Sequence, residues 1–229
     1  MKTIGILGSV TWQATIEYYR IINEIVANKL GGHHCAKIVM TCTDFENLVQ
    51  LAKTNKWDEM ASMLTKEVQK LEKSGADFFL ICSNSIHKIA EKITTQVSIP
   101  ILHIVEVTAQ KIQELKIQKT ALFGTNFTME DGFYHKIMDK YGIEIMVPDK
   151  PDRHFIHNSI FEELAYGKFQ ESTKKEYIRI IQSQVDKGAE GLILGCTEIP
   201  LLMRQVDVHI PIFDTTQIHA VAAAHMALA

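Results

Sequence analysis

The feature that most restricts the fold is an internal repeat relating the two halves of the chain. The segment 75–86 (GADFFLICSNSI) aligns with 188–199 (GAEGLILGCTEI) at an offset of 113 residues, which matches Ser83 with Cys196. Further matches in the same order, at offsets of 111 and 116, are 99–101 with 210–212 (both IPI) and Gly8 with Gly124. Three ordered matches at a nearly constant offset indicate a duplicated structural unit.

Apolar runs rich in β-branched residues alternate with segments of helical periodicity. The periodic segments 58–73 and 173–187 each place apolar residues along one stripe of a helix. Such alternation predicts parallel sheets covered by helices, with functional residues at the carboxyl ends of the strands. The strand-like runs are 3–7, 37–42, 76–82, 99–104, 119–124, 143–147, 189–194 and 210–213.

Composition and charge exclude several classes of protein. Hydrophobic residues make up 46% and charged residues 22% of the 229 residues, which is the range of ordinary globular domains. The net charge of −3, without a basic block, argues against nucleic-acid or acidic-membrane partners. The apolar run at the N-terminus is too short for a signal peptide, and no run is long enough to span a bilayer. We therefore expect a cytoplasmic protein. The four cysteines match no zinc spacing, so no metal site is predicted.

The matched residues Ser83 and Cys196 each follow a predicted strand and begin a strand-to-helix turn. Free backbone N–H groups and the helix dipole favour an anion at such a turn, and they lower the pKa of a thiol from about 8.5 toward neutrality. Two similar halves related by a pseudo-two-fold axis would set these residues on opposite walls of one cleft. A pair of acid/base groups on opposite faces of a carbon centre is what inversion requires, since one group removes a proton and the other supplies one.

Several motifs resemble the aspartate/glutamate racemase family. The segment 8–15 (GSVTWQAT) resembles its N-terminal loop, 82–88 (CSNSIHK) its first active-site motif, and 195–198 (GCTE) its second. The segments 124–129 (GTNFTM) and 160–164 (IFEEL) also resemble family features, so the resemblance covers essentially the whole chain.

The resemblance implies an isomerase, a racemase that interconverts L- and D-aspartate and/or glutamate with two bases and no cofactor. Cys196 is then the base that takes the Cα proton of the L-amino acid, and Ser83 stands where the family has its first cysteine. A hydroxyl residue there is associated with a subgroup that prefers the L-enantiomer, so the same preference is expected here. Cys82 lies one residue earlier and should point the opposite way if the strand persists.

The same motifs supply the predicted substrate contacts. Arg153 is the candidate cation for a side-chain carboxylate, with a solvated surface residue as the alternative reading. His87 could orient a catalytic group or could be a surface or capping residue, and His103 is expected to be a satisfied core histidine. The predicted substrate-binding residues are Val10, Asn84, Ser85, Thr125, Thr128, Thr197, Glu198 and Arg153.

The predicted architecture is α/β, with two similar parallel-sheet subdomains related by pseudo-two-fold symmetry and the active site in the cleft between them. By the resemblance, the C-terminal helix near 217–228 returns to the first half. The expected N-terminal subdomain is therefore 1–105 plus 210–229, and the expected C-terminal subdomain is 106–209.

Two other kinds of function stay open at this stage. One is a related enzyme that acts on another carbon acid, of the hydantoin racemase, maleate isomerase or malonate decarboxylase type. The other is a non-catalytic amino-acid-binding protein, because the first thiol is missing. The expected partner is a small amino-acid substrate, and a homodimer is an additional option.

Overall fold

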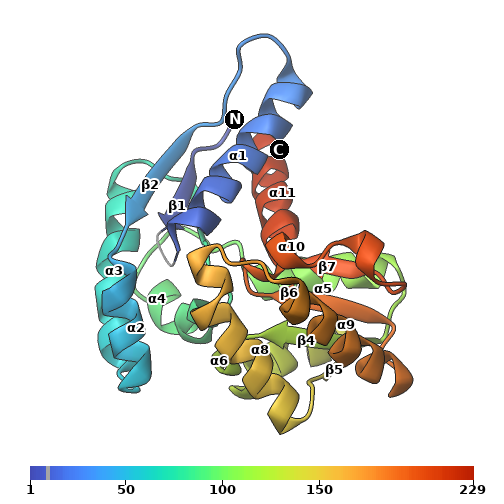
Figure 1. Cartoon of the computed structure of the whole chain (residues 1–229). Helices are drawn as coiled ribbons and strands as arrows, with labels where there is room; N and C mark the ends of the chain where they lie inside the picture. Colours follow the sequence, from blue (N-terminus) through green and yellow to red (C-terminus); the bar gives the residue numbers. More distant parts are fainter. Residues whose placement is uncertain (9–10) are drawn as a thin grey trace. The chain divides into compact units, whose positions relative to one another are not determined.

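The computed structural model describes residues 1–8 and 11–229. Contacts divide the chain into two compact units, and Figure 1 follows the chain through them. Unit 1 consists of residues 1–104 and 219–229, and unit 2 of residues 105–218. Val10, a predicted substrate contact, lies outside the described residues. No described helix is both long and apolar enough to cross a membrane.

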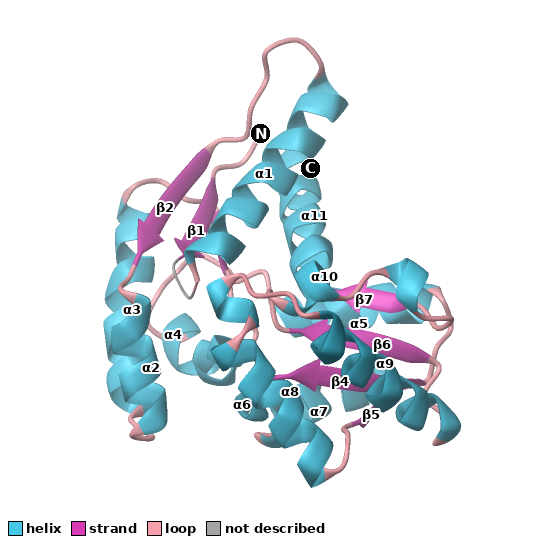
Figure 2. Cartoon of the chain, in the orientation of Figure 1, coloured by secondary structure: helices cyan, strands magenta, loops and turns pink. Residues whose placement is uncertain are grey.

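Unit 1 is built on a parallel sheet with the strand order β2-β1-β3. Figure 2 shows its strands between the surrounding helices. Its elements are β1 (Ile4–Gly8), α1 (Trp12–Leu30), β2 (Ile38–Cys42), α2 (Phe45–Lys53), α3 (Trp57–Lys73), β3 (Phe78–Ile81), the 3₁₀ helix η1 (Ser85–Ile89), α4 (Ala90–Thr94) and most of α11 (Thr215–Leu228).

Alternate strand residues decide which helices cover each face of this sheet. Ile4 and Ile6 of β1 and Leu80 of β3 join one apolar cluster with α1 and α11. The α11 side of the cluster consists of alanines, whose small side chains let the helix lie close to the sheet. The other face is covered by α3, whose apolar stripe of Met60, Leu64, Val68 and Leu71 is completely buried.

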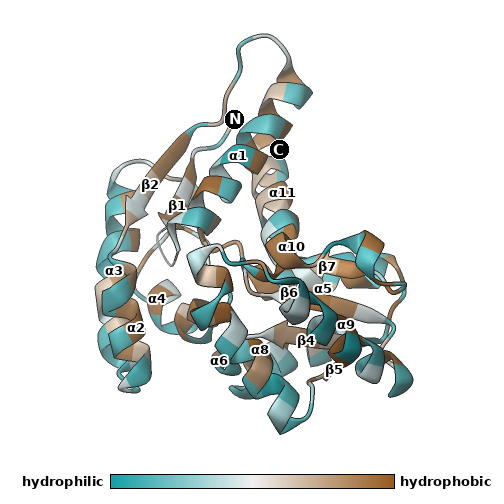
Figure 3. Ribbon diagram, in the orientation of Figure 1, coloured by the Kyte–Doolittle hydropathy of each residue, from teal (hydrophilic) through white to brown (hydrophobic). Residues whose placement is uncertain are grey.

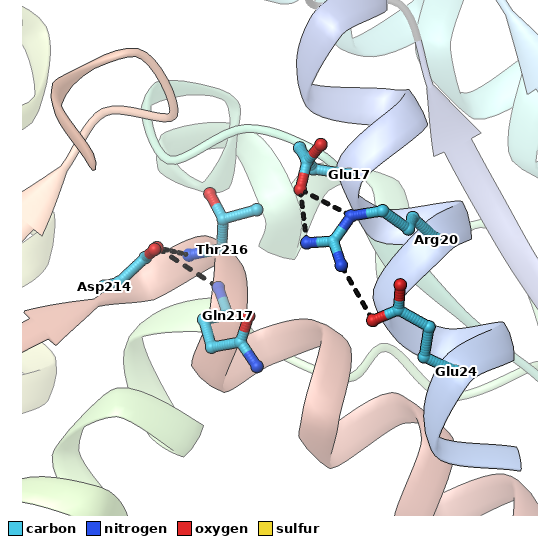
Figure 4. A network of polar contacts seen from close by, with 6 residues as sticks. All are labelled: Glu17, Arg20, Glu24, Asp214, Thr216 and Gln217. Atoms are coloured by element: carbon cyan, nitrogen blue, oxygen red, sulfur yellow. Dashed lines mark hydrogen bonds and ion pairs between the residues drawn. The ribbon is translucent and has the colours of Figure 1, made fainter. Parts of the chain in front are cut away.

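The solvent side of α1 carries ion pairs at helical spacing. The guanidinium of Arg20 lies 2.7 Å from the carboxylates of both Glu17 and Glu24 (Figure 4). These pairs span positions i,i+3 and i,i+4, which face each other on a helix surface. Exposed pairs of this kind contribute little to stability, so the apolar face dominates the packing of α1.

Unit 2 is built on a parallel sheet with the order β5-β4-β6-β7. The ring centroid of Tyr177 on α9 lies 6.1 Å from that of Phe123 on β4 and 6.2 Å from that of Phe155 on α8. These ring contacts pack α8 and α9 against the sheet. The central strand β6 is fully buried and lies toward the hydrophobic end of the scale in Figure 3. The elements are α5 (Ile104–Glu114), β4 (Lys119–Gly124), α6 (Asn126–Glu130), α7 (Phe133–Met138), η2 (Asp139–Tyr141), β5 (Glu144–Met146), α8 (Lys150–Glu162), η3 (Leu164–Tyr166), α9 (Glu171–Asp186), β6 (Gly191–Gly195), α10 (Ile199–Leu202), η4 (Gln205–Asp207) and β7 (Ile212–Asp214).

The predicted duplication is confirmed by strand order and by register. The order β2-β1-β3 in unit 1 corresponds to β5-β4-β6 in unit 2. Leu7 pairs with Ile81 across β1 and β3, and Phe123 pairs with Leu194 across β4 and β6. Ser83 and Cys196 therefore both follow the paired residue by two positions. The sheet register gives the same equivalence that the sequence repeat predicted.

The predicted strand at 99–104 is reduced to a single bridge. Ile101 pairs with Phe79, and the backbone N–H of Phe79 donates to Pro100 O at 3.0 Å. The backbone N–H of Leu102 donates back to Phe79 O at 2.8 Å, and α5 begins two residues later, at Ile104. The equivalent segment of unit 2 pairs more extensively, as β7 beside β6.

The pairing of β7 also determines where the units divide near the C-terminus. Because β7 pairs with β6, residues 210–218 lie with unit 2, whereas the sequence-based boundary was placed before residue 210. The start of α11 is capped by Asp214, whose carboxylate accepts from the backbone N–H groups of Thr216 at 2.9 Å and Gln217 at 3.1 Å (Figure 4). Asp214 is thus the residue that caps the N-terminus of α11.

Candidate active site

The turn that carries Cys196 follows the end of β6 at Gly195. A side chain at Gly195 would place its Cβ 2.9 Å from Leu122 Cδ1 and 3.0 Å from Thr128 Cγ2. A Cβ at Gly124, on the neighbouring strand β4, would lie 2.9 Å from the carbonyl oxygen of Gly195. The backbone oxygen beside Gly124 cannot move aside, so glycine is required there, and at Gly195 a side chain would have to displace the ends of Leu122 and Thr128.

A buried carboxylate stands directly beside the Cys196 thiol. Glu198 is only 5% exposed, and its Oε2 accepts from Cys196 Sγ at 2.9 Å and from Thr197 Oγ1 at 2.8 Å. The thiol therefore holds its proton in this arrangement and points it at an acceptor. Three consecutive residues of the predicted second motif, Cys196 to Glu198, form one hydrogen-bonded group.

The predicted lowering of the thiol pKa is wrong for this structure. Burial of the thiol, followed by the neighbouring carboxylate of Glu198, raises the pKa of Cys196 well above its usual range. The helix that follows, α10, has only four residues, so its dipole is small. Burial, together with a negative charge in hydrogen-bond contact, therefore outweighs the backbone N–H groups and the weak dipole.

Polar groups from the end of β4 lie beside this turn. Thr125 and Thr128 are buried, and their hydroxyl oxygens are 3.4 Å apart. The backbone N–H of Asn126 donates to Nδ1 of His157 at 3.2 Å. The side-chain Oδ1 of Asn126 is buried and has no hydrogen-bond partner among the described residues. Thr128 contacts the Gly195 position, so the predicted residues Thr125, Thr128, Thr197 and Glu198 gather with Cys196 in unit 2.

Arg153 has structural partners within unit 2. Its Nε donates to Glu130 Oε1 at 2.9 Å, and its Nη1 donates to the backbone oxygen of Pro148 at 2.7 Å. Two edges of the guanidinium are thus engaged by α6 and by the segment before α8. The role of Arg153 as a ligand for a substrate carboxylate stays a prediction.

The turn that carries Ser83 follows β3 in unit 1. Ser83 and Asn84 are buried, and Ser83 Oγ lies 3.5 Å from Ser85 Oγ. The preceding residue, Cys82, belongs to the apolar cluster with α1 and α11, and burial raises the pKa of its thiol. Cys82 is therefore packed as a core residue, which fits the expectation that it points away from the Ser83 side.

The histidine of the first motif is not a surface residue. His87 is only 3% exposed, and its Nδ1 lies 2.6 Å from the carbonyl oxygen of Ser83. The ring of His103 packs against it with a centroid distance of 4.5 Å. His219 on α11 joins the same group, and the sequence offered no signal for it because its partners are far away in the chain.

Comparison with known proteins identifies relatives along the whole chain. A profile of the Asp/Glu/Hydantoin racemase family matches residues 7–223. The broad specificity amino-acid racemase RacX of Bacillus subtilis is 26% identical over 159 residues, which cover 69% of this chain and 68% of RacX. The glutamate racemase of Persephonella marina is 29% identical over 148 residues, and this match spans 62% of this chain but only 55% of that relative.

Solved structures give a consistent result. A candidate Asp/Glu racemase from Yersinia pestis has a TM-score of 0.95 and 41% identity, with both chains fully covered. An aspartate racemase homologue from Pyrococcus horikoshii has a TM-score of 0.87 and 30% identity, again with full coverage of both chains. The two-unit α/β architecture is thus that of solved relatives, and the family match covers nearly every described element. The chain belongs to the Asp/Glu/Hydantoin racemase family, and its enzyme class is that of the isomerases.

Proposed function

We propose that this protein is a cofactor-independent racemase of aspartate and/or glutamate, in which Cys196 and Ser83 supply the two acid/base groups. The observation that carries the proposal is the contact between the Cys196 thiol and the buried Glu198 carboxylate, 2.9 Å apart. It gives the thiol a built-in acceptor for its proton. The equivalence of Ser83 and Cys196 in sheet register supports a two-group mechanism.

The reaction from the L-amino acid begins with two proton transfers in unit 2. The Cys196 thiol gives its proton to Glu198 Oε2, and the thiolate then takes the Cα proton of the substrate. The hydroxyl of Thr197, 2.8 Å from the same Oε2, stabilises that carboxylate while it is charged. Asn84, Ser85, Thr125 and Thr128 are the proposed donors that hold the substrate and the charge that forms on it.

The second half of the reaction delivers a proton to the other face of Cα. Ser83 Oγ–H gives this proton. Solvent then returns a proton to Ser83 Oγ and takes the proton that Glu198 accepted, while the Cys196 thiol keeps the hydrogen removed from Cα until it exchanges with solvent. In the repeat, Ser85 occupies the position that matches Glu198, so Ser83 has a hydroxyl neighbour at 3.5 Å where Cys196 has a carboxylate. A hydroxyl donates a proton more readily than it becomes a base, because it needs activation to ionise. The proposal therefore includes a preference for the L-enantiomer.

The test is hydrogen exchange at Cα in heavy water, with L- and D-aspartate and L- and D-glutamate as substrates. The protein is first dialysed against a chelator, and no pyridoxal phosphate is added. We expect Cys196→Ala to lower exchange of the L-substrates by about 10²–10⁴-fold, the usual loss for one positioned acid/base group. Cys35→Ala removes an exposed thiol and serves as the control. Exchange in Cys196→Ala at the rate of the unmodified protein would exclude Cys196 as the base, and binding without any exchange would favour an amino-acid-binding protein.

A further inference from the structure

We propose that His87 is a positioning residue that holds the Ser83 turn in the geometry needed for its half of the reaction. This inference rests on the proposed function and assigns a role within the same site. Both ring nitrogens of His87 are bonded to backbone groups, the carbonyl oxygen of Ser83 and the N–H of Ile104, so His87 does not act on the reacting atoms directly. Its effect reaches Ser83 through the peptide that follows that residue.

The hydrogen bonds of His87 fix its tautomer. Nδ1 lies 2.6 Å from the carbonyl oxygen of Ser83, and a carbonyl oxygen accepts, so Nδ1 carries the hydrogen. Nε2 lies 3.3 Å from the backbone nitrogen of Ile104, and a backbone N–H donates, so Nε2 is bare. The ring is thus neutral and uses both nitrogens to join the Ser83 turn to the start of α5.

A second histidine keeps the surroundings of His87 uncharged. His219 Nε2 lies 2.8 Å from the carbonyl oxygen of Leu102, so Nε2 carries a hydrogen, and its Nδ1 lies 2.8 Å from the hydroxyl of Tyr18. The rings of His103 and His219 lie 4.5 Å and 5.8 Å from the His87 ring. Burial and these neighbouring histidines lower the pKa of His87 well below its ordinary value, and burial lowers the pKa of His219 to about 3.

The bond from His87 sets the direction of the Ser83–Asn84 peptide. This peptide is trans, so holding the Ser83 carbonyl toward His87 turns the N–H of Asn84 to the opposite side. The Cα atoms of Ser83 and Asn84, both proposed site residues, lie in this peptide plane, so fixing the plane restricts where their side chains can be placed. A misplacement of about 1 Å at a reacting group can lower a rate by about 100-fold.

The corresponding turn of unit 2 is held by other means. The repeat offset that matches Ser83 with Cys196 matches His87 with Pro200, which has no side-chain donor. There, Glu198 bonds the side chains of the turn directly. A defect at His87 should therefore affect the steps that need Ser83 and spare the exchange performed by Cys196, whereas general loss of structure would affect both.

Three His87 variants and one control separate these outcomes. His87→Asn retains a donor close to the position of Nδ1, His87→Gln can reach only the position of Nε2, and His87→Leu removes both groups. His219→Leu is the control, because it removes an equally buried histidine with two hydrogen bonds but none to the Ser83 turn. The readouts are the ratio of inversion to Cα exchange for the L-substrate and deuterium uptake at backbone amides of the 82–88 segment.

We expect His87→Leu and His87→Gln to lower the ratio of inversion to exchange by at least about tenfold. His87→Asn should restore most of the ratio, and His219→Leu should leave it within about twofold even if total activity falls. Amide deuterium uptake at 82–88 should rise in His87→Leu and His87→Gln but not in His87→Asn or His219→Leu. Equal ratios in His87→Gln and His87→Asn, or unchanged uptake in His87→Gln, would overturn the inference. If the proposed function is wrong, the unmodified protein will show no Cα exchange. The amide deuterium uptake of the variants does not depend on catalysis, so it tests the positioning role separately.

Discussion

Replacing Glu198 with glutamine separates two roles for this carboxylate, proton acceptor for Cys196 and ligand for substrate. Glutamine has nearly the same shape, and its amide oxygen can still accept the hydrogen bonds that now measure 2.9 Å from Cys196 Sγ and 2.8 Å from Thr197 Oγ1. The variant removes the negative charge and the basic site, and it leaves the packing of the turn almost unchanged. A change in rate then reports on proton transfer.

Two effects of Glu198→Gln should run in opposite directions. The carboxylate helps to raise the pKa of Cys196, so its removal should lower that pKa and increase the alkylation of the resting thiol by iodoacetamide near neutral pH. Turnover should fall, because no base is left to receive the thiol proton in the catalytic cycle. Loss of one positioned acid/base group typically lowers a rate by about 10²–10⁴-fold, which corresponds to roughly 3–5 kcal/mol in the barrier.

The assay combines alkylation rates over a range of pH with kcat and KM for L-aspartate and L-glutamate. We expect kcat to fall while KM changes little, since a residue that contacts the thiol and not the substrate should not weaken binding. Glu163→Gln is the matched control, because the Glu163 carboxylate also accepts a hydrogen bond from a hydroxyl, that of Thr173 at 2.5 Å, and is not part of the hydrogen-bonded group 196–198. A rise in KM with unchanged kcat would refute the acceptor role and restore Glu198 as a substrate ligand. Slower alkylation in Glu198→Gln would refute the electrostatic argument.

Three further predictions test other parts of the reasoning. Ser83→Cys puts a group that ionises near pH 8.5 in place of a hydroxyl, so Cα exchange of D-substrate should rise relative to L-substrate; an unchanged D/L ratio would argue against Ser83 as the second group. Gly124→Ala brings a Cβ within 2.9 Å of the backbone oxygen of Gly195 and should destabilise the protein by about 1–3 kcal/mol in urea unfolding, and an unchanged midpoint would contradict the close approach of β4 and β6. The folded-state pKa of His219 is about 3, below its ordinary value of 6.5, so the unfolded chain binds the extra proton first and stability should fall as the pH drops from 6.5 toward 3; His219→Gln should flatten that part of the stability curve.

The sequence was sufficient to predict the features that repeat. The two sheets, their parallel strands and the equivalence of Ser83 with Cys196 all appear as matched segments at nearly constant offsets, so they could be found without coordinates. The expected subdomain boundary before residue 210 differed from the structure because β7 pairs with β6, and such pairing depends on three-dimensional neighbours. The C-terminal part of α11 does pack in unit 1, as the family resemblance implied.

The features that the sequence could not supply depend on burial and on contacts between distant residues. The pKa of Cys196 followed from enclosure and from Glu198, whereas the sequence offered only a turn and a presumed dipole. Tyr18 and His219 are separated by 201 residues, so their hydrogen bond leaves no local pattern. The relation of Glu198 to Cys196 was within reach, because a carboxylate two residues after a thiol is visible in the sequence, although it was interpreted as a substrate contact.

The turns of Ser83 and Cys196 follow equivalent strands but carry different acid/base groups, and this difference affects the direction of the reaction. In unit 2 a thiol donates to a carboxylate, so a base can form there when Glu198 takes the proton. In unit 1 the matched pair is two hydroxyls, and the added contact is from a neutral histidine to a backbone carbonyl. A hydroxyl held in place by its peptide is suited to donating a proton, whereas a thiol with its own acceptor is suited to removing one. An enzyme built this way should therefore exchange the Cα hydrogen of an L-amino acid more often than it inverts the centre.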